Sequence, residues 1–253
     1  DAVILDLEDS VPPADKTAAR QALAANWQEL MTLDVPMIVR INAEHSAAWA
    51  DDVAAVGELA GLAAVMVPKA ELPETLSDLH ARLRGVALLP LIETAAGFHA
   101  VRALAGAPGV LRLTVGHIDF MADVGITCDA DESELAPLRF AVALATREAR
   151  LASAIDGVTV QTADDLQLRK DTLRARRFGF GGKLCIHPRQ IAGVHVALAP
   201  TESELDWARR VIAADEAAAG AAVQLDGRMV DLPVVLQARR TLARAAPPGR
   251  SGS

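Results

Sequence analysis

The chain of 253 residues is long enough for one large α/β domain or for two ordinary domains, and 51% of its residues are hydrophobic. Aromatic residues make up only 3% and tyrosine is absent, which disfavours an aromatic-rich β-sandwich and favours helices packed on aliphatic strands. The net charge of −8 argues against a nucleic-acid partner, and no apolar run is long enough to span a membrane.

Two cysteines, Cys128 and Cys185, are too few for a disulfide framework and indicate a reducing compartment. We therefore expect a cytoplasmic location. No signal peptide is visible, but the chain begins at Asp1 inside a predicted strand, so we expect its natural start to lie further upstream.

Short apolar runs alternate with amphipathic stretches, which predicts repeated βα units and a parallel sheet. The runs are continuous, as in strands that are buried on both faces. Seven strands are predicted, at residues 2–7, 37–41, 64–67, 86–92, 111–115, 154–158 and 183–186. Because a TIM (β/α)8 barrel needs eight strands, we predict such a barrel with its first strand before Asp1. A doubly wound open sheet is the alternative, although no glycine-rich fingerprint follows a first strand.

Helices are predicted at residues 16–30, 95–104, 134–151 and 163–177. After the last strand the pattern changes to a C-terminal extension. Thr201 to Glu204 form a capping box that begins a helix through Ala219, and residues 223–230 form a hairpin that turns at Asp226-Gly227. A final helix begins at Asp231. We expect a barrel domain at 1–199, the extension at 200–246 and a disordered tail at 247–253.

Charged side chains follow the ends of several predicted strands. In chain order they are Asp6, Glu8, Asp9, Arg40, Lys69, Glu71, Glu93 and Asp119. The carboxyl ends of barrel strands converge on one mouth, so we expect these side chains to share a cavity. For any one residue the alternative is an ordinary polar loop, since Asp and Glu favour helix N-termini.

Glu93 and Asp119 are the predicted magnesium ligands. Mg²⁺ prefers octahedral oxygen ligands and usually keeps several waters, so that one or two protein carboxylates suffice. Asp6, Glu8 and Asp9 are then expected to hydrogen-bond the waters on the metal.

Arg40 and Lys69 are the predicted cations of the site. The planar fork of Arg40 matches a substrate carboxylate in two parallel hydrogen bonds, with a structural ion pair to the acids at 6–9 as the alternative. Lys69 is expected to balance acidic charge or contact substrate, together with Arg40 and Glu93. A Schiff-base role for Lys69 is less favoured because a metal site makes it redundant. No partner is placed for His117, and no zinc cluster or serine nucleophile is found.

Seven segments match a known pattern in the same order. They are DAVILDLEDSV at 1–11, VRIN at 39–42, VPKAE at 67–71, LIET at 91–94, GHIDF at 116–120, CIHPRQ at 185–190 and GRMVDLP at 227–233. In these segments the chain resembles the citrate lyase beta-subunit-like group of the HpcH/HpaI aldolase family.

The resemblance implies a TIM barrel with a C-terminal extension, magnesium dependence and a homotrimer. It implies a carbon–carbon lyase that cleaves or forms a hydroxyacyl-coenzyme A thioester of the citryl, malyl or citramalyl type, giving an acyl thioester and a 2-oxo acid. The metal ligands of the family fall on Glu93 and Asp119, and its carboxylate-binding arginine falls on Arg40. Its catalytic aspartate, delivered by a neighbouring subunit, falls on Asp231. The extension would then pack on that neighbour; the alternative is that Asp231 only caps a helix.

Two departures from the family pattern bear on the substrate. The first strand and its Pro-Gly-x-Arg turn are absent, and Ile118 stands where an acidic residue usually precedes the metal aspartate. The alternatives are a metal-dependent aldolase on free 2-oxo acids, or a non-catalytic or subunit homologue.

Overall fold

The computed structural model describes residues 1–245, which divide between two compact units, Asp1–Gln190 and the residues from Ile191 onward. The predicted disordered tail at 247–253 lies outside the described residues. Within residues 1–245, no helix combines the length and the apolar character needed to cross a membrane.

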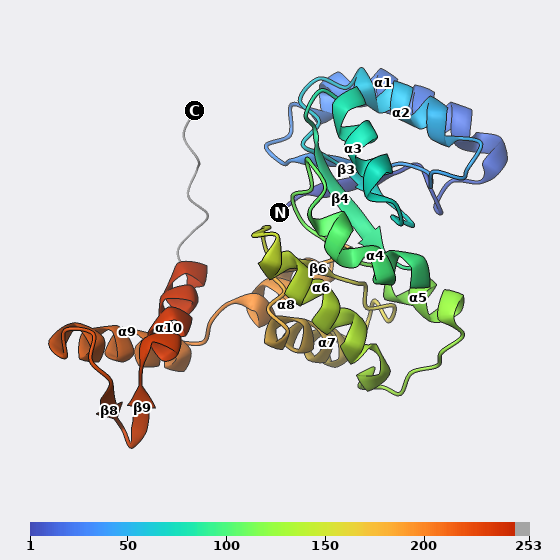
Figure 1. Ribbon diagram of the computed structural model, residues 1–253. Helices are drawn as coiled ribbons and strands as arrows, with labels where there is room; N and C mark the ends of the chain where they lie inside the picture. Colours follow the sequence, from blue (N-terminus) through green and yellow to red (C-terminus); the bar gives the residue numbers. More distant parts are fainter. Residues whose placement is uncertain (246–253) are drawn as a thin grey trace. The chain divides into compact units, whose positions relative to one another are not determined.

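The first unit is built on a parallel sheet whose seven strands follow one another in space in their sequence order (Figure 1). The strands are β1 (Val3–Asp6), β2 (Met37–Arg40), β3 (Ala64–Val67), β4 (Ala87–Ile92), β5 (Thr114–Val115), β6 (Ile155–Asp156) and β7 (Gly182–Lys183). This order confirms the predicted α/β class. The last three strands are shorter than predicted, and Leu111 and Ile186, which extended two of them, lie outside the ladders with 46% and 54% of their surface exposed.

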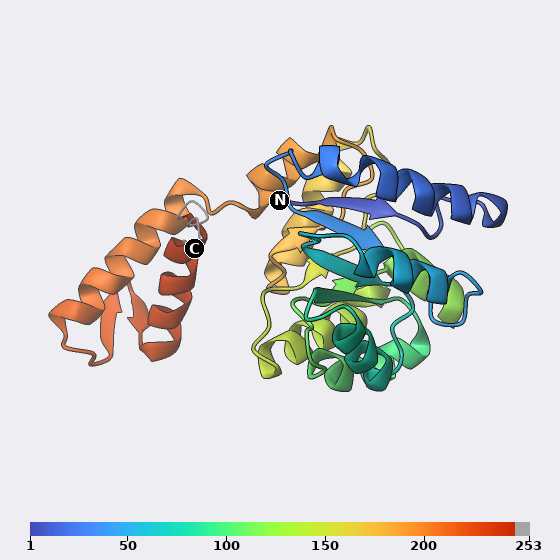
Figure 2. The same ribbon diagram turned by 90° about the horizontal axis from the view of Figure 1, so that it is seen from above.

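The sheet is curled (Figure 2). Ile4 of β1 and Leu184, which follows β7, both pack against one buried cluster on the inner face. That cluster consists of Ile38, Ala64, Met66 and Leu89. β1 and β7 are each hydrogen-bonded on one side only. The described residues therefore form a curled seven-stranded sheet and not a closed barrel. The strand predicted before Asp1 stays a prediction.

Helices connect the strands and cover the outer face. They are α1 (Lys16–Leu30), α2 (Trp49–Gly57), α3 (Pro73–Arg82), α4 (Ala95–Ala105), α5 (His117–Val124), α6 (Ala136–Glu148) and α7 (Asp165–Arg177). A further helix, α8 (Gln190–Leu198), follows β7 in the chain, and all but its first residue belong to the second unit. Short 3-10 turns at Pro13–Asp15 and Ser133–Leu135 precede α1 and α6. The Thr94 hydroxyl accepts the Gly97 N–H at 3.0 Å and caps α4, because the first N–H groups of a helix have no partner within it.

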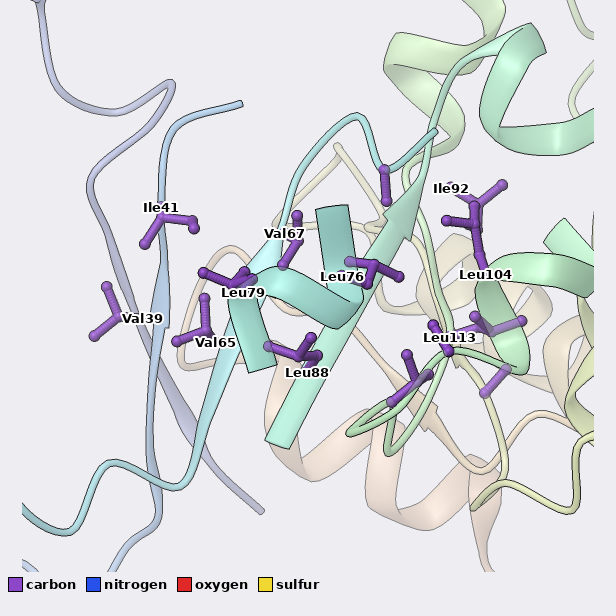
Figure 3. Packing of buried hydrophobic residues seen from close by; sticks show 14 of the residues in the cluster. Val39, Ile41, Val65, Val67, Leu76, Leu79, Leu88, Ile92, Leu104 and Leu113 are labelled. Carbon is purple, nitrogen blue, oxygen red and sulfur yellow. The ribbon is translucent and has the colours of Figure 1, made fainter. Parts of the chain in front are cut away.

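The main core lies between the strands and this helical layer (Figure 3). Val65 and Val67 of β3 point outward to Leu76 and Leu79 of α3, whereas Met66 between them points into the inner cluster. Strand side chains alternate between the two faces. Since both faces are buried, every position of such a strand is apolar, which explains the continuous runs in the sequence.

The second unit contains α9 (Glu202–Ala217), the strands β8 (Val223–Leu225) and β9 (Arg228–Val230), and α10 (Leu232–Ala245). The predicted capping box of Thr201 and Glu204 is confirmed. The hairpin turns through Asp226 and Gly227 with φ of 50° and 75°, the left-handed pair that a two-residue hairpin favours. A small core of Ala208, Val211, Val230, Val235 and Ala238 joins the helices and the hairpin.

Candidate active site

Arg40 lies at the carboxyl end of β2, beside Asp6 at the end of β1. The two residues are partners in the parallel ladder, so their side chains emerge next to each other. Arg40 Nε donates to Asp6 Oδ1 at 2.7 Å and Nη2 donates to Asp6 Oδ2 at 2.5 Å. The fork of Arg40 is therefore filled by Asp6, which is the structural ion pair that we gave as the alternative to binding of a substrate carboxylate. The remaining nitrogen, Nη1, lies 3.0 Å from Glu8 Oε2 and 3.4 Å from Asp9 Oδ2.

Electrostatics follow from this pairing. Burial alone raises the pKa of Asp6, but hydrogen bonds from Arg40, Ser10 and the Glu8 N–H outweigh it and lower the pKa from 3.8 to about 2. Burial lowers the pKa of Arg40, but its bonds to Asp6 outweigh that effect and raise it above its usual value. Both side chains therefore stay charged at neutral pH.

Glu93 closes β4 and is only 2% exposed. Its Oε1 accepts the backbone N–H of Lys69 at 2.8 Å. Its Oε2 lies against Gly116, where a Cβ would stand 2.4 Å from that oxygen, so only glycine leaves room. Burial, together with the like charges of Glu8 and Asp119, raises the pKa of Glu93 from 4.5 to about 8. A buried carboxyl group with acidic neighbours is a typical environment for a cation ligand.

The side chain of Lys69 lies between Glu8, beside Arg40, and Glu93 at the end of β4. Its Nζ lies 3.2 Å from Glu8 Oε1 and 4.0 Å from Glu93 Oε1. Glu8 is 6% exposed, and burial raises its pKa although Arg40 and Lys69 oppose the shift. Burial lowers the pKa of Lys69, but the charges of Glu8 and Glu93 outweigh it and raise that pKa.

Asp119 lies in the first turn of α5 and is half-buried. Its charge contributes to the raised pKa values of both Glu93 and Lys69, so it belongs to the same electrostatic cluster. The first unit thus brings together all of the predicted site residues that it contains. A cleft of about 620 Å³ opens beside them and is lined by Glu8, Asp9 and Lys69, among others.

The donor set fits a magnesium ion. Within residues 1–245, no group of three or more His, Cys, Asp or Glu side chains is arranged to hold a metal alone. Mg²⁺ does not require such a group, because it retains waters and takes one or two carboxylates. Three carboxyl groups, Glu8, Glu93 and Asp119, gather around the single ammonium of Lys69, and a divalent cation beside Glu93 would offset their mutual repulsion.

Asp231 lies in the second unit, immediately before α10. Its Oδ1 is 3.4 Å from the N–H of Val234, a weak N-terminal cap of that helix. The residue is half-buried, and the backbone carbonyl of Asp231 accepts the N–H of Val235 at 3.0 Å.

Several polar residues around the site were not predicted from the sequence. Asn42 and Asp52 form a buried hydrogen-bonded pair behind Arg40. Thr94 donates to Glu71 Oε1 at 2.8 Å in the loop next to Glu93. His117 is 3% exposed, with Nε2 3.8 Å from Glu132 Oε1. The spacing of Asn42 two residues after Arg40 was the one available signal, since it places both at the same strand end.

Comparisons with known proteins show a family for this chain. The family model of HpcH/HpaI aldolase/citrate lyase matches residues 1–188. The citrate lyase subunit beta-like protein of Deinococcus radiodurans is 35% identical, covering 97% of this chain and 89% of its own. The (3S)-malyl-CoA thioesterase of Cereibacter sphaeroides is 31% identical over 97% of this chain and 86% of its own.

The fold is also similar to that of a relative whose structure is solved. The crystal structure of CitE from Mycobacterium tuberculosis, in complex with magnesium, acetoacetate and coenzyme A, is 34% identical with a TM-score of 0.84. The match covers 97% of this chain and 90% of that one.

Proposed function

The chain belongs to the HpcH/HpaI aldolase/citrate lyase family, and from this premise we propose that it is a magnesium-dependent carbon–carbon lyase. Its proposed substrate is a hydroxyacyl-coenzyme A thioester, which it cleaves to an acyl thioester and a 2-oxo acid or forms from them. The complex of CitE with magnesium and coenzyme A supports both the metal and the thioester.

One observation carries the proposal: the buried carboxyl group of Glu93 at the end of β4 has a raised pKa, to which the charges of Glu8, which follows β1, and of Asp119 in the first turn of α5 contribute. A buried acid in this position lowers the stability of the protein when it is charged, because burial penalises the charged form. Such a residue is therefore expected to have a function. Mg²⁺ held by Glu93 and Asp119 would act as a Lewis acid, lowering the pKa of the substrate hydroxyl and stabilising charge on the 2-oxo acid.

The cations of the site bind and orient the substrate in this proposal. Asp6 holds two nitrogens of Arg40, so the guanidinium is fixed in orientation while Nη1 still faces Glu8 and Asp9. A substrate carboxylate would bind at Nη1. Lys69 keeps its charge at neutral pH and would hold a second oxygen of the substrate, because its Nζ reaches toward both Glu8 and Glu93.

Asp231 is the proposed proton donor. In the cleavage direction a base takes the hydroxyl proton, the carbon–carbon bond breaks as the carbonyl of the 2-oxo acid forms, and the pair of electrons remains on the thioester as an enolate. Asp231 of a neighbouring copy then gives its proton to the enolate carbon, and it removes that proton in the reverse direction. Positioned proton transfer of this kind contributes about 10²–10⁴-fold.

The second unit has the surface expected of an arm that packs on another copy. Met229, Leu232 and Leu236 are exposed by 72%, 67% and 41%, and they follow closely on one another in the chain where β9 leads into α10. Exposed apolar groups in one patch mark interaction surfaces. We propose that the protein is a cytoplasmic homotrimer in which these residues pack on a neighbouring copy. We also propose that the curled sheet forms most of the wall of an α/β barrel.

The test is an assay of the whole protein against citryl-, malyl- and citramalyl-coenzyme A, with and without Mg²⁺. We expect Mg²⁺-dependent release of a 2-oxo acid. Asp119→Asn should remove this activity, while Asp123→Asn, one turn later on the same helix, should retain it. Release of 2-oxo acid without a divalent cation would contradict the proposal. Cleavage of free hydroxy-oxo acids alone would favour the aldolase alternative, and binding without turnover would favour a non-catalytic subunit.

A further inference from the structure

A buried carboxylate lies behind the site, on a helix that none of the roles above involves. Asp52 of α2 has no exposed surface, and both of its oxygens are used. Oδ2 accepts the backbone N–H of Asn42 at 2.8 Å and its Nδ2 at 2.6 Å. Oδ1 accepts Arg20 Nη1 at 2.9 Å.

Asn42 passes this connection to the end of β1. Its Nδ2 also donates to the carbonyl of Leu7 at 2.8 Å. Leu7 lies between Asp6 and Glu8, two of the acids that contact Arg40, and the Leu7 N–H donates to the Arg40 carbonyl at 2.9 Å. Asp52 is therefore linked through one side chain to the segment that holds the guanidinium.

The position of this link matters because the ladder ends there. Asp6 and Arg40 are the last paired residues of β1 and β2, and the bond from the Leu7 N–H to the Arg40 carbonyl extends the ladder by one residue. The Asn42–Leu7 bond is a connection past that point. Lys16 Nζ strengthens the same segment by donating to the carbonyls of Leu7 and Glu8 at 2.7 and 2.6 Å.

We infer that Asp52 is a positioning residue for Arg40: through Asn42 it holds the Asp6–Glu8 segment against the end of β2 and so sets where Arg40 Nη1 meets a substrate carboxylate. The inference rests on the proposed function only in taking a carboxylate as the ligand of Arg40. An isosteric amide at position 52 would set an NH₂ group against donors of Asn42 or Arg20, since all three partners are donors.

Asp51 provides a matched control. It precedes Asp52 on α2 and also pairs with Arg20, at 3.1 Å, but its side chain is 69% exposed and makes no contact with Asn42. A purely structural role for the helix–strand contact would lower stability and leave the geometry of Arg40 unchanged in the folded protein. A positioning role changes that geometry.

The experiment uses the full chain and two measurements. The first is the NMR signal of the Arg40 Nε–H group, identified by its loss in Arg40→Lys. The second is calorimetric binding of Mg²⁺ and then of pyruvate, together with KM and kcat for any thioester that is turned over. Asp52→Asn should move the Arg40 signal and weaken pyruvate binding by about 10- to 100-fold, the usual effect of removing a partner that orients a ligating group. KM should rise more than kcat falls, and Mg²⁺ affinity should stay within about threefold, because the proposed metal ligands lie at the end of β4 and on α5.

Asp51→Asn should leave both measurements as they are in the unmodified protein. If Asp52→Asn fails to fold, Asn42→Ala cuts the same link while the buried Asp52 carboxylate keeps its bonds from the backbone N–H of residue 42 and from Arg20, and it should move the Arg40 signal in the same way. An unchanged Arg40 signal in a folded Asp52→Asn or Asn42→Ala variant would overturn the inference. Failure of the unmodified protein to bind pyruvate or to turn over any thioester would instead count against the proposed function. The Arg40 signal in the Asp52→Asn variant would still show whether Asp52 positions Arg40.

Discussion

Lys69 donates its backbone N–H to Glu93 Oε1 at 2.8 Å from a left-handed backbone conformation, with φ of 46°. A residue other than glycine in this conformation costs about 1–3 kcal/mol and persists where its surroundings determine it. Here it turns an N–H at the end of β3 toward the acid at the end of β4. With Gly116 against the other oxygen, the Glu93 carboxyl group is fixed at both ends.

The raised pKa of Glu93 predicts that Mg²⁺ binding releases a proton. With a pKa of about 8, Glu93 is largely protonated at neutral pH in the metal-free protein, and only its charged form binds a cation. Affinity should rise about tenfold per pH unit below that value and level off above it. Calorimetry in two buffers of different ionisation enthalpy measures the proton. Mg²⁺ affinity that does not change with pH would contradict the assignment, and Glu93→Gln is the control that should not bind.

The same shift predicts how stability depends on pH without metal. Because the pKa of Glu93 is raised from 4.5 to about 8 in the folded state, folding favours its proton. Its contribution to stability is therefore complete at acidic pH and is lost as the pH rises through about 8. Without Mg²⁺, the free energy of unfolding in urea should decrease as the pH rises from 4.5 to about 8. With Mg²⁺ present, this decrease should be smaller. In Glu93→Gln this part of the pH dependence should disappear.

Gly116→Ala should displace the metal ligand. The new Cβ would lie 2.4 Å from Glu93 Oε2 and 2.7 Å from its Cβ, too close for either atom to remain in place. We expect Mg²⁺ affinity to fall at least about tenfold and stability to fall by about 1–3 kcal/mol, as in other overpacked sites. Gly106→Ala is the matched control, because its Cβ would meet its nearest neighbour at an ordinary 3.5 Å. Normal Mg²⁺ affinity in a folded Gly116→Ala variant would disprove this account of Glu93.

The contribution of Asp6 to the free energy of unfolding should decrease at acidic pH. Its pKa is lowered from 3.8 to about 2, so its contribution is present above the higher value and lost as the pH falls toward the lower one. Asp6→Asn should cost about 1–3 kcal/mol at neutral pH, the range for a hydrogen-bonded charged pair, and this cost should vanish near pH 2. Asp9→Asn removes an exposed contact to the same Arg40 and should cost at most about 0.5 kcal/mol. Equal losses in the two variants, measured by unfolding, would refute the special role of Asp6.

Mixing two inactive variants should restore activity if Asp231 serves a neighbouring copy. Asp231→Asn supplies an intact Glu93, and Glu93→Gln supplies an intact Asp231. In oligomers formed from equal amounts, about a quarter of the sites combine one intact residue of each kind, and turnover should approach that fraction. If Asp231 only caps α10, Asp231→Asn should keep its turnover and lose about 0.5–2 kcal/mol of stability.

The apolar periodicity and the charged residues at strand ends were sufficient to predict the βα order and to place Arg40, Lys69, Glu93 and Asp119 near one edge of a parallel sheet. These features are local, because strand formation and strand-to-helix loops depend on neighbours in the chain. Lateral register is not local. It pairs Asp6 with Arg40 and so fills the fork that the sequence left open for substrate. The same packing of distant segments buries Asp52 behind Asn42 and sets Lys69 in its left-handed turn against Glu93, contacts that no spacing along the chain encodes.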